Sequence, residues 1–128
     1  MEYILSTIST MKNISYLGWQ KTDEILNLLL SSDLGFFPGT HSVIWEQACG
    51  VGLPCVFKNW DGIQHVDLGG NCIFLNDISK ETISYVINEL YNDKNKIINM
   101  SRVANEKCIS HFSYYDIAQR EINGQNSN

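Results

Sequence analysis

The residues best suited to chemistry lie in one stretch, residues 37–54. The stretch begins at the end of an apolar run, passes through a turn with Gly39 and His41, and continues as a short helix pattern with Glu46 and Gln47. A helix that opens from such a turn directs free N–H groups and its positive dipole end toward the crevice above a sheet. Because this geometry suits phosphate groups, the stretch predicts a nucleotide or nucleotide-sugar site.

A small set of polar and glycine residues is predicted to contact this ligand. The turn residues would lie over the phosphates, and His41 could contact a pyrophosphate or leaving-group oxygen. Lys58 follows an apolar run, at the strand end where ligands bind in open parallel sheets. For both side chains the alternative is an ordinary solvated position. We assign no catalytic residue, metal ligand or cofactor, and the candidate binding residues of the turn and the strand end are Gly39, Thr40, His41, Ser42 and Lys58.

The other ligand-type side chains follow no recognisable pattern. His65 and His111 have no carboxylate or cysteine at a familiar spacing and are interpreted as structural. The cysteines are irregularly spaced, which predicts neither a zinc motif nor a disulfide framework. We therefore expect buried or incidental thiols at Cys49, Cys55, Cys72 and Cys108.

Alternating strands and helices are expected to position the candidate residues. Short runs rich in β-branched and aromatic residues predict strands at 14–17, 34–37, 55–57 and 72–75. A helix capped by Thr22 separates the first two, and the helix of the 37–54 stretch separates the next two. This alternation implies parallel strands with right-handed crossovers. The predicted fold class is α/β, a Rossmann-like doubly wound parallel sheet of about four strands.

Helices are expected after the last strand. Ser79 or Asp77 can cap one of them, a second covers about residues 94–110, and a short third one follows. No repeat or linker divides the chain, so residues 1–122 are predicted to form one domain and residues 123–128 a disordered polar tail.

Composition limits the function classes. A chain of 128 residues with 44% hydrophobic content is expected to be one domain. Its formal charge of −5, without a basic run, argues against nucleic-acid binding. No stretch approaches the ~20 apolar residues that cross a bilayer, and no signal-peptide pattern opens the chain. We expect a cytoplasmic location, at most peripheral at the inner face of the membrane.

Several short sequence motifs occur in an order found in one enzyme family. They are Ser-Asp before the second strand, Gln-Ala in the helix after it, Gly-Leu-Pro before the third strand, Asp-Gly-Ile-Gln-His-Val at 61–66, Asn-Cys-Ile-Phe-Leu at 71–75 and His-Phe-Ser-Tyr at 111–114. Together they resemble, over most of the chain, the C-terminal half of GT-B glycosyltransferases of the large family 4 group. The resemblance implies that this part holds the nucleotide diphosphate of an activated sugar, while an N-terminal half supplies the acceptor site.

The resemblance also implies particular roles for two positions. Family members carry two glutamates separated by seven residues, the first on the donor sugar and the second on the ribose hydroxyls. Alignment on Gly-Leu-Pro places Gly39 and Gln47 there, whereas a shift of one residue places Pro38 and Glu46 there. Gln47 or Glu46 is thus the candidate ribose ligand, since an amide also offers an acceptor and donors.

Parts of the family domain are missing from the sequence. The family has two earlier strands and a basic pair that neutralises the pyrophosphate, whereas residues 1–12 supply at most the tail of a helix. In the strand order 3-2-1-4-5-6, residues 14–17 would form the third strand. Alternatively they pair beside 34–37 in a smaller sheet. We interpret the domain as an incomplete GT-B C-terminal domain, inactive without an acceptor domain.

Three functional hypotheses stay open. The first is the donor-binding part of a hexosyltransferase that extends a surface glycan, such as capsular or lipopolysaccharide, from a nucleotide-sugar substrate. The second is a flavodoxin-like or receiver-like module, although residues 36–38 offer no phosphorylatable Asp. The third is a degenerate, non-catalytic binding or interaction module, which the loss of both glutamates favours. Exposed strand edges would also favour homo-oligomers.

Overall fold

Three of the predicted apolar runs form a parallel sheet in the computed structural model, which describes residues 1–125. The strands are β1 (Gly35–Phe37), β2 (Cys55–Lys58) and β3 (Cys72–Leu75), in the order β1-β2-β3. Val56 lies opposite Phe36 on one side and Ile73 on the other. The central strand is apolar on both faces because both are covered by helices. The α/β class with a parallel sheet is therefore confirmed.

The predicted strand at residues 14–17 is wrong. These residues lie in an irregular, exposed segment before the second helix, so the sheet has three strands rather than four. In the strand order 3-2-1-4-5-6, this segment would be the third strand and would pair only with a strand that residues 1–125 do not contain. Without a neighbouring strand, its backbone groups have no partners for the hydrogen bonds of a sheet. It does not pair beside β1 either, so β1 has one edge without a partner strand among the described residues.

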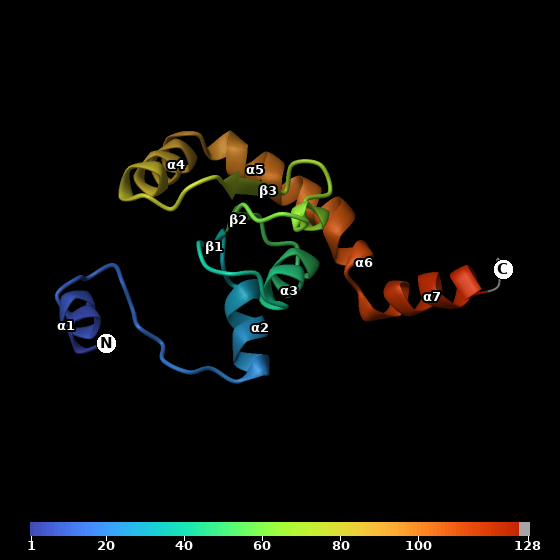
Figure 1. The fold of residues 1–128 in the computed structure, drawn as a ribbon, viewed down its shortest axis with the longest axis horizontal. Coiled ribbons are helices and arrows are strands. Elements are labelled where there is room, and N and C mark those ends of the chain that lie inside the picture. Colours follow the sequence, from blue (N-terminus) through green and yellow to red (C-terminus); the bar gives the residue numbers. More distant parts are fainter. Residues whose placement is uncertain (126–128) are drawn as a thin grey trace.

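Helices cover both faces of the sheet, as Figure 1 shows. The face nearest α2 and α3 holds a core with Trp45 and Phe57, and the face nearest α4 and α5 holds a second core with Val56 and Leu90. The helical elements are α1 (Glu2–Ser9), α2 (Thr22–Leu30), α3 (Ile44–Gly50), the 3₁₀ turn η1 (Gln64–Val66), α4 (Lys80–Asn92), α5 (Lys94–Val103), the π-helical turn η2 (Ala104–Cys108), α6 (Ile109–His111) and α7 (Tyr114–Gln125).

Local chemistry explains where several helices begin. Thr22 is the first residue of α2 rather than its cap; the backbone N–H of Lys21 donates to the Glu24 carboxylate at 2.8 Å. Ser79 caps α4, and its hydroxyl accepts from the Thr82 N–H at 3.2 Å. The helix predicted at 94–110 is present as the continuous run of α5, η2 and α6.

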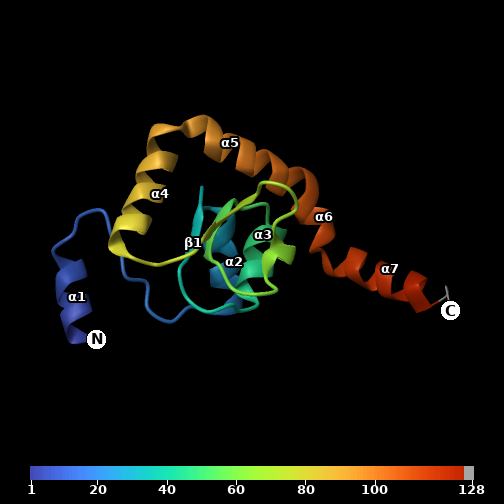
Figure 2. The same ribbon diagram turned by 45° about the horizontal axis from the view of Figure 1, so that its top comes forward.

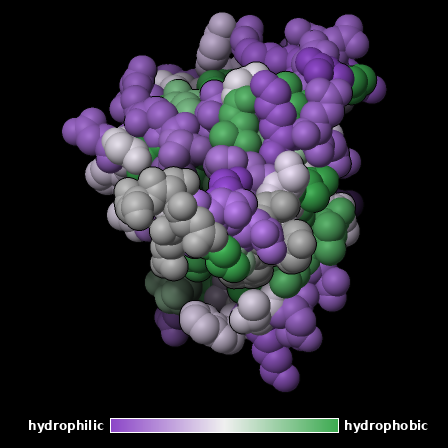
Figure 3. Space-filling view, turned by 90° about the vertical axis from the view of Figure 1, so that its right-hand side faces the viewer, coloured by the Kyte–Doolittle hydropathy of each residue, from purple (hydrophilic) through white to green (hydrophobic). Residues whose placement is uncertain are grey.

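Both ends of the chain extend from the body around the sheet (Figures 1 and 2). α1 buries none of its residues, and an extended segment connects it to α2. The tail predicted at 123–128 is helical as far as Gln125, where α7 ends, and residues 126–128 lie outside the described part. The face seen from the side of α7 is mostly hydrophilic, with separate smaller apolar areas (Figure 3).

Candidate functional site

The predicted site residues gather at the carboxyl edge of the sheet. The loop of residues 38–43 connects the end of β1 to α3, and Lys58 is the last residue of β2. Gly39, Thr40, His41 and Ser42 are all exposed on this loop. Since parallel strands end at the same edge, the loop, the first turn of α3 and Lys58 lie around one end of the sheet.

A histidine–glutamate–histidine cluster is the most distinctive feature of this edge. Oε1 of Glu46 lies 2.9 Å from Nε2 of His41 and 2.9 Å from Nε2 of His65. Burial raises the pKa of Glu46, but the hydrogen bonds with His65 and His41 together outweigh burial and hold the pKa below its ordinary value. Glu46 is therefore an ionised carboxylate shared between two imidazoles.

Only one oxygen of Glu46 takes part in these contacts. Oε2 is buried and has no hydrogen-bond partner within residues 1–125. A buried carboxylate oxygen without a donor costs free energy, because it has lost its water and gained nothing in exchange. The cluster is thus incomplete as a purely internal hydrogen-bond network.

Aromatic side chains fix the loop and His41. Trp45 stacks on Phe57 with ring centroids 4.1 Å apart, and His41 meets Trp45 edge-on at 5.2 Å. Trp60 donates from Nε1 to the carbonyl oxygen of Gly39 at 3.1 Å, and Nζ of Lys58 lies 4.1 Å from the Trp60 ring centroid. These contacts link Lys58 to the loop through Trp60 and a cation–π interaction.

A buried asparagine holds the segment that carries His65. Asn71 accepts from the Leu68 N–H at 2.6 Å and donates to the Val66 carbonyl oxygen at 2.9 Å. Oδ1 of Asp67 accepts from the backbone N–H of Asn71 at 3.0 Å. These bonds close the turn after η1 and place His65 beside α3.

Glu46 and Gln47 also line a cavity of about 460 Å³ between α2, α3 and the segment after α6. Its lining is largely apolar, with Leu26, Val43 and Phe112 among the contributors. Pockets of 300–1,000 Å³ with few polar groups are typical of small-ligand sites. Glu46 therefore belongs both to the histidine cluster and to the wall of this cavity.

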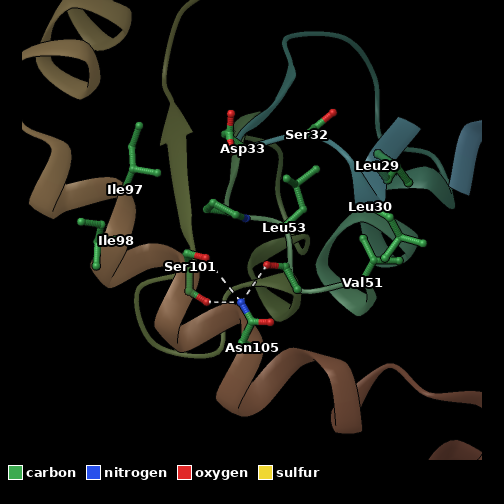
Figure 4. Close-up of a pocket in the computed structure, with 12 residues that line it drawn as sticks. Leu29, Leu30, Ser32, Asp33, Val51, Leu53, Ile97, Ile98, Ser101 and Asn105 are labelled. Atoms are coloured by element: carbon green, nitrogen blue, oxygen red, sulfur yellow. Dashed lines mark hydrogen bonds between the residues drawn. The ribbon is translucent and has the colours of Figure 1, made fainter. Parts of the chain in front are cut away.

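A second cavity, of about 420 Å³, lies at the opposite edge of the sheet (Figure 4). Ser32, Asp33 and Leu53 come before β1 and β2, and Asn105 donates to the Ser101 carbonyl oxygen at 2.8 Å. Because ligands of open α/β sheets bind at the carboxyl ends of the strands, we do not assign the nucleotide site to this cavity.

His65, for which the sequence offers no partner at a familiar spacing, has a carboxylate partner in the structure. Glu46 precedes it by 19 residues. No local spacing signals this pair, since it depends on where η1 follows β2. His41 and Glu46 are only five residues apart. The sequence predicts them as contacts of the pyrophosphate and of the ribose, not as partners of each other.

The cysteines are free thiols, as expected. Cys49, Cys55 and Cys108 are buried, and Cys72 is partly buried. Burial raises the pKa of Cys108 to about 12. Contact with the Cys49 thiol, together with burial, raises the pKa of Cys55 and of Cys72. Cys55, Cys72 and Cys108 are therefore protonated core residues.

None of the helices within residues 1–125 has the length and apolar character to cross a bilayer. No known protein family, curated protein or solved structure matches this chain.

Proposed function

We propose that this chain is the donor-binding part of a glycosyltransferase that transfers a sugar from a nucleotide to a surface glycan. The observation that carries the proposal is the position of Glu46 and Gln47. Both lie in the first turns of α3, the helix that begins at the carboxyl edge of the sheet, and both line a largely apolar cavity of about 460 Å³ between α2, α3 and the segment after α6. This edge is where open α/β sheets bind nucleotides, and the volume suits a small ligand.

Gln47 is the proposed ligand of the ribose hydroxyls. Glu46 already shares Oε1 with two histidines, whereas Gln47 lines the same cavity with an amide that can both donate and accept. This difference supports the alignment that places Gln47, rather than Glu46, at the second glutamate position of the family.

The loop of residues 38–43 and Lys58 are the proposed contacts of the diphosphate. Lys58 would supply the positive charge, and the backbone N–H groups of the exposed residues Gly39 and Thr40 would supply hydrogen-bond donors. A single lysine neutralises less of a leaving diphosphate than the basic pair of the family. Since electrostatic stabilisation is a large part of such catalysis, we propose that the chain binds donor but does not transfer sugar by itself.

Lys58→Ala is expected to weaken binding of a nucleoside diphosphate about 10-fold, because it removes a charge-assisted contact worth about 1.5 kcal/mol. Isothermal titration calorimetry with nucleoside diphosphates measures the change. Lys12→Ala, in the exposed segment before α2, is the matched control and should bind as the unaltered chain does. Equal affinities for Lys58→Ala and Lys12→Ala would contradict the role given to Lys58.

A non-catalytic interaction module is the second candidate. It is favoured by the exposed aromatic and aliphatic side chains between α1 and α2, among them Tyr16, Leu17 and Trp19. If the chain binds no nucleoside diphosphate and no nucleotide sugar in the same titrations, this second candidate replaces the donor-binding function.

A further inference from the structure

We propose that His41, Glu46 and His65 bind a divalent transition-metal ion of the zinc class. The inference goes beyond donor binding, because it concerns the metal alone and needs no nucleotide. It follows from three side chains that converge from the loop before α3, from α3 itself and from η1.

The geometry is close to that of a bound ion. One ligand atom from each residue can be chosen so that all three lie within 4.8 Å of one another, and each histidine Nε2 is 2.9 Å from Oε1 of Glu46. In a tetrahedral site with metal–ligand bonds of about 2.0–2.1 Å, neighbouring ligand atoms are about 3.4 Å apart. Each histidine Nε2 would therefore have to move only about half an ångström farther from Oε1 of Glu46 to admit the ion.

The unpartnered oxygen of Glu46 is an independent observation that points to a cation. Oε2 is buried and has no hydrogen-bond donor among residues 1–125. A cation between the two imidazoles would interact with the whole carboxylate and neutralise its charge. The ion would thus give Oε2 the favourable contact that the two histidines, which bind only Oε1, do not provide.

The donor set indicates the class of metal. Two imidazole nitrogens and one carboxylate suit Zn²⁺, Co²⁺, Ni²⁺ or Cu²⁺, whereas Mg²⁺ and Ca²⁺ prefer sites built from oxygen ligands. Three protein ligands leave a fourth position for water, as in zinc sites that stay open to a further ligand. Both histidines are exposed, so this fourth position is accessible from solvent.

Cobalt binding to the purified full chain, without a polyhistidine tag, tests the proposal. After treatment with chelator and its removal, Co²⁺ should bind at one ion per chain and give the visible absorption of a four-coordinate site, and Zn²⁺ should displace it. His41→Ala, His65→Ala and Glu46→Gln should each weaken Co²⁺ binding by about 100-fold or more, because even partners outside the ligand set change metal affinity 10–100-fold.

His111→Ala is the matched control, since His111 is another exposed histidine and contacts Arg120 rather than the cluster. It should bind Co²⁺ like the unaltered chain, and circular dichroism should show that all the variants are folded. The proposal is overturned by the absence of a visible band, by a band that persists in His41→Ala and His65→Ala, or by a sulfur-to-cobalt charge-transfer band that assigns the metal to the cysteines.

Discussion

Replacing Trp45 by alanine should lower the free energy of unfolding by about 3–5 kcal/mol, the usual cost of removing a large buried aromatic side chain. Trp45 is only 1% exposed and stacks on Phe57 of the central strand, with ring centroids 4.1 Å apart. It also supports His41 through an edge-on contact. Its loss would therefore leave a cavity in the core and release the loop that begins the candidate site.

Urea denaturation followed by circular dichroism measures this effect. Trp19→Ala is a matched control, because Trp19 is 97% exposed and exposed positions usually change stability by no more than about 0.5 kcal/mol. The midpoint should fall sharply for Trp45→Ala and stay nearly constant for Trp19→Ala. Equal losses for both variants would show that Trp45 is not packed in the core as described.

Asn71→Ala is expected to cost about 2–4 kcal/mol, since each buried group left without a partner costs about 1–3 kcal/mol. Asn71 is 0% exposed, and its amide satisfies the Leu68 N–H and the Val66 carbonyl oxygen. The same bonds close the turn after η1, so the substitution should also loosen the segment that carries His65.

Urea denaturation and hydrogen exchange at the Leu68 amide test this prediction together. The Leu68 amide should exchange faster in Asn71→Ala than the loss of global stability alone explains. Asn92→Ala, at an exposed position of α4, is the control and should change stability by less than about 0.5 kcal/mol. Unchanged stability of Asn71→Ala would refute the structural role of the asparagine.

Most of the fold could be predicted because local patterns agree with tertiary packing. The continuous apolar runs at β2 and β3 indicate strands covered on both faces, and α2 lies where a helix is predicted, although Thr22 is its first residue rather than its cap. The segment 14–17 is also rich in apolar residues but has no partner strand among the described residues. Composition reports how well a segment suits a sheet, whereas strand formation also needs a neighbour to hydrogen-bond with.

The candidate site could be predicted only in part. The turn of residues 39–42 and Lys58 follow from the rule that helix starts and ligands lie at the carboxyl ends of parallel strands, whereas Glu46 and Gln47 are candidates only through the family resemblance. His65 could not be predicted, since its contact with Glu46 depends on the path of the chain between β2 and β3. The hydrogen bond from Trp60 to the carbonyl oxygen of Gly39 could not be predicted either, because the two residues are far apart in the sequence.

The most direct test of donor binding is the response of individual backbone amides to nucleotides. Nucleoside diphosphates and nucleotide sugars are added to the isotope-labelled chain in the absence of metal, and amide shifts are followed by NMR. Donor binding predicts saturable shifts at Gly39–Ser42, Glu46, Gln47 and Lys58, with little change near Ser101 and Asn105 at the opposite edge. Shifts confined to that opposite edge, or no saturable response to any nucleotide, would contradict it.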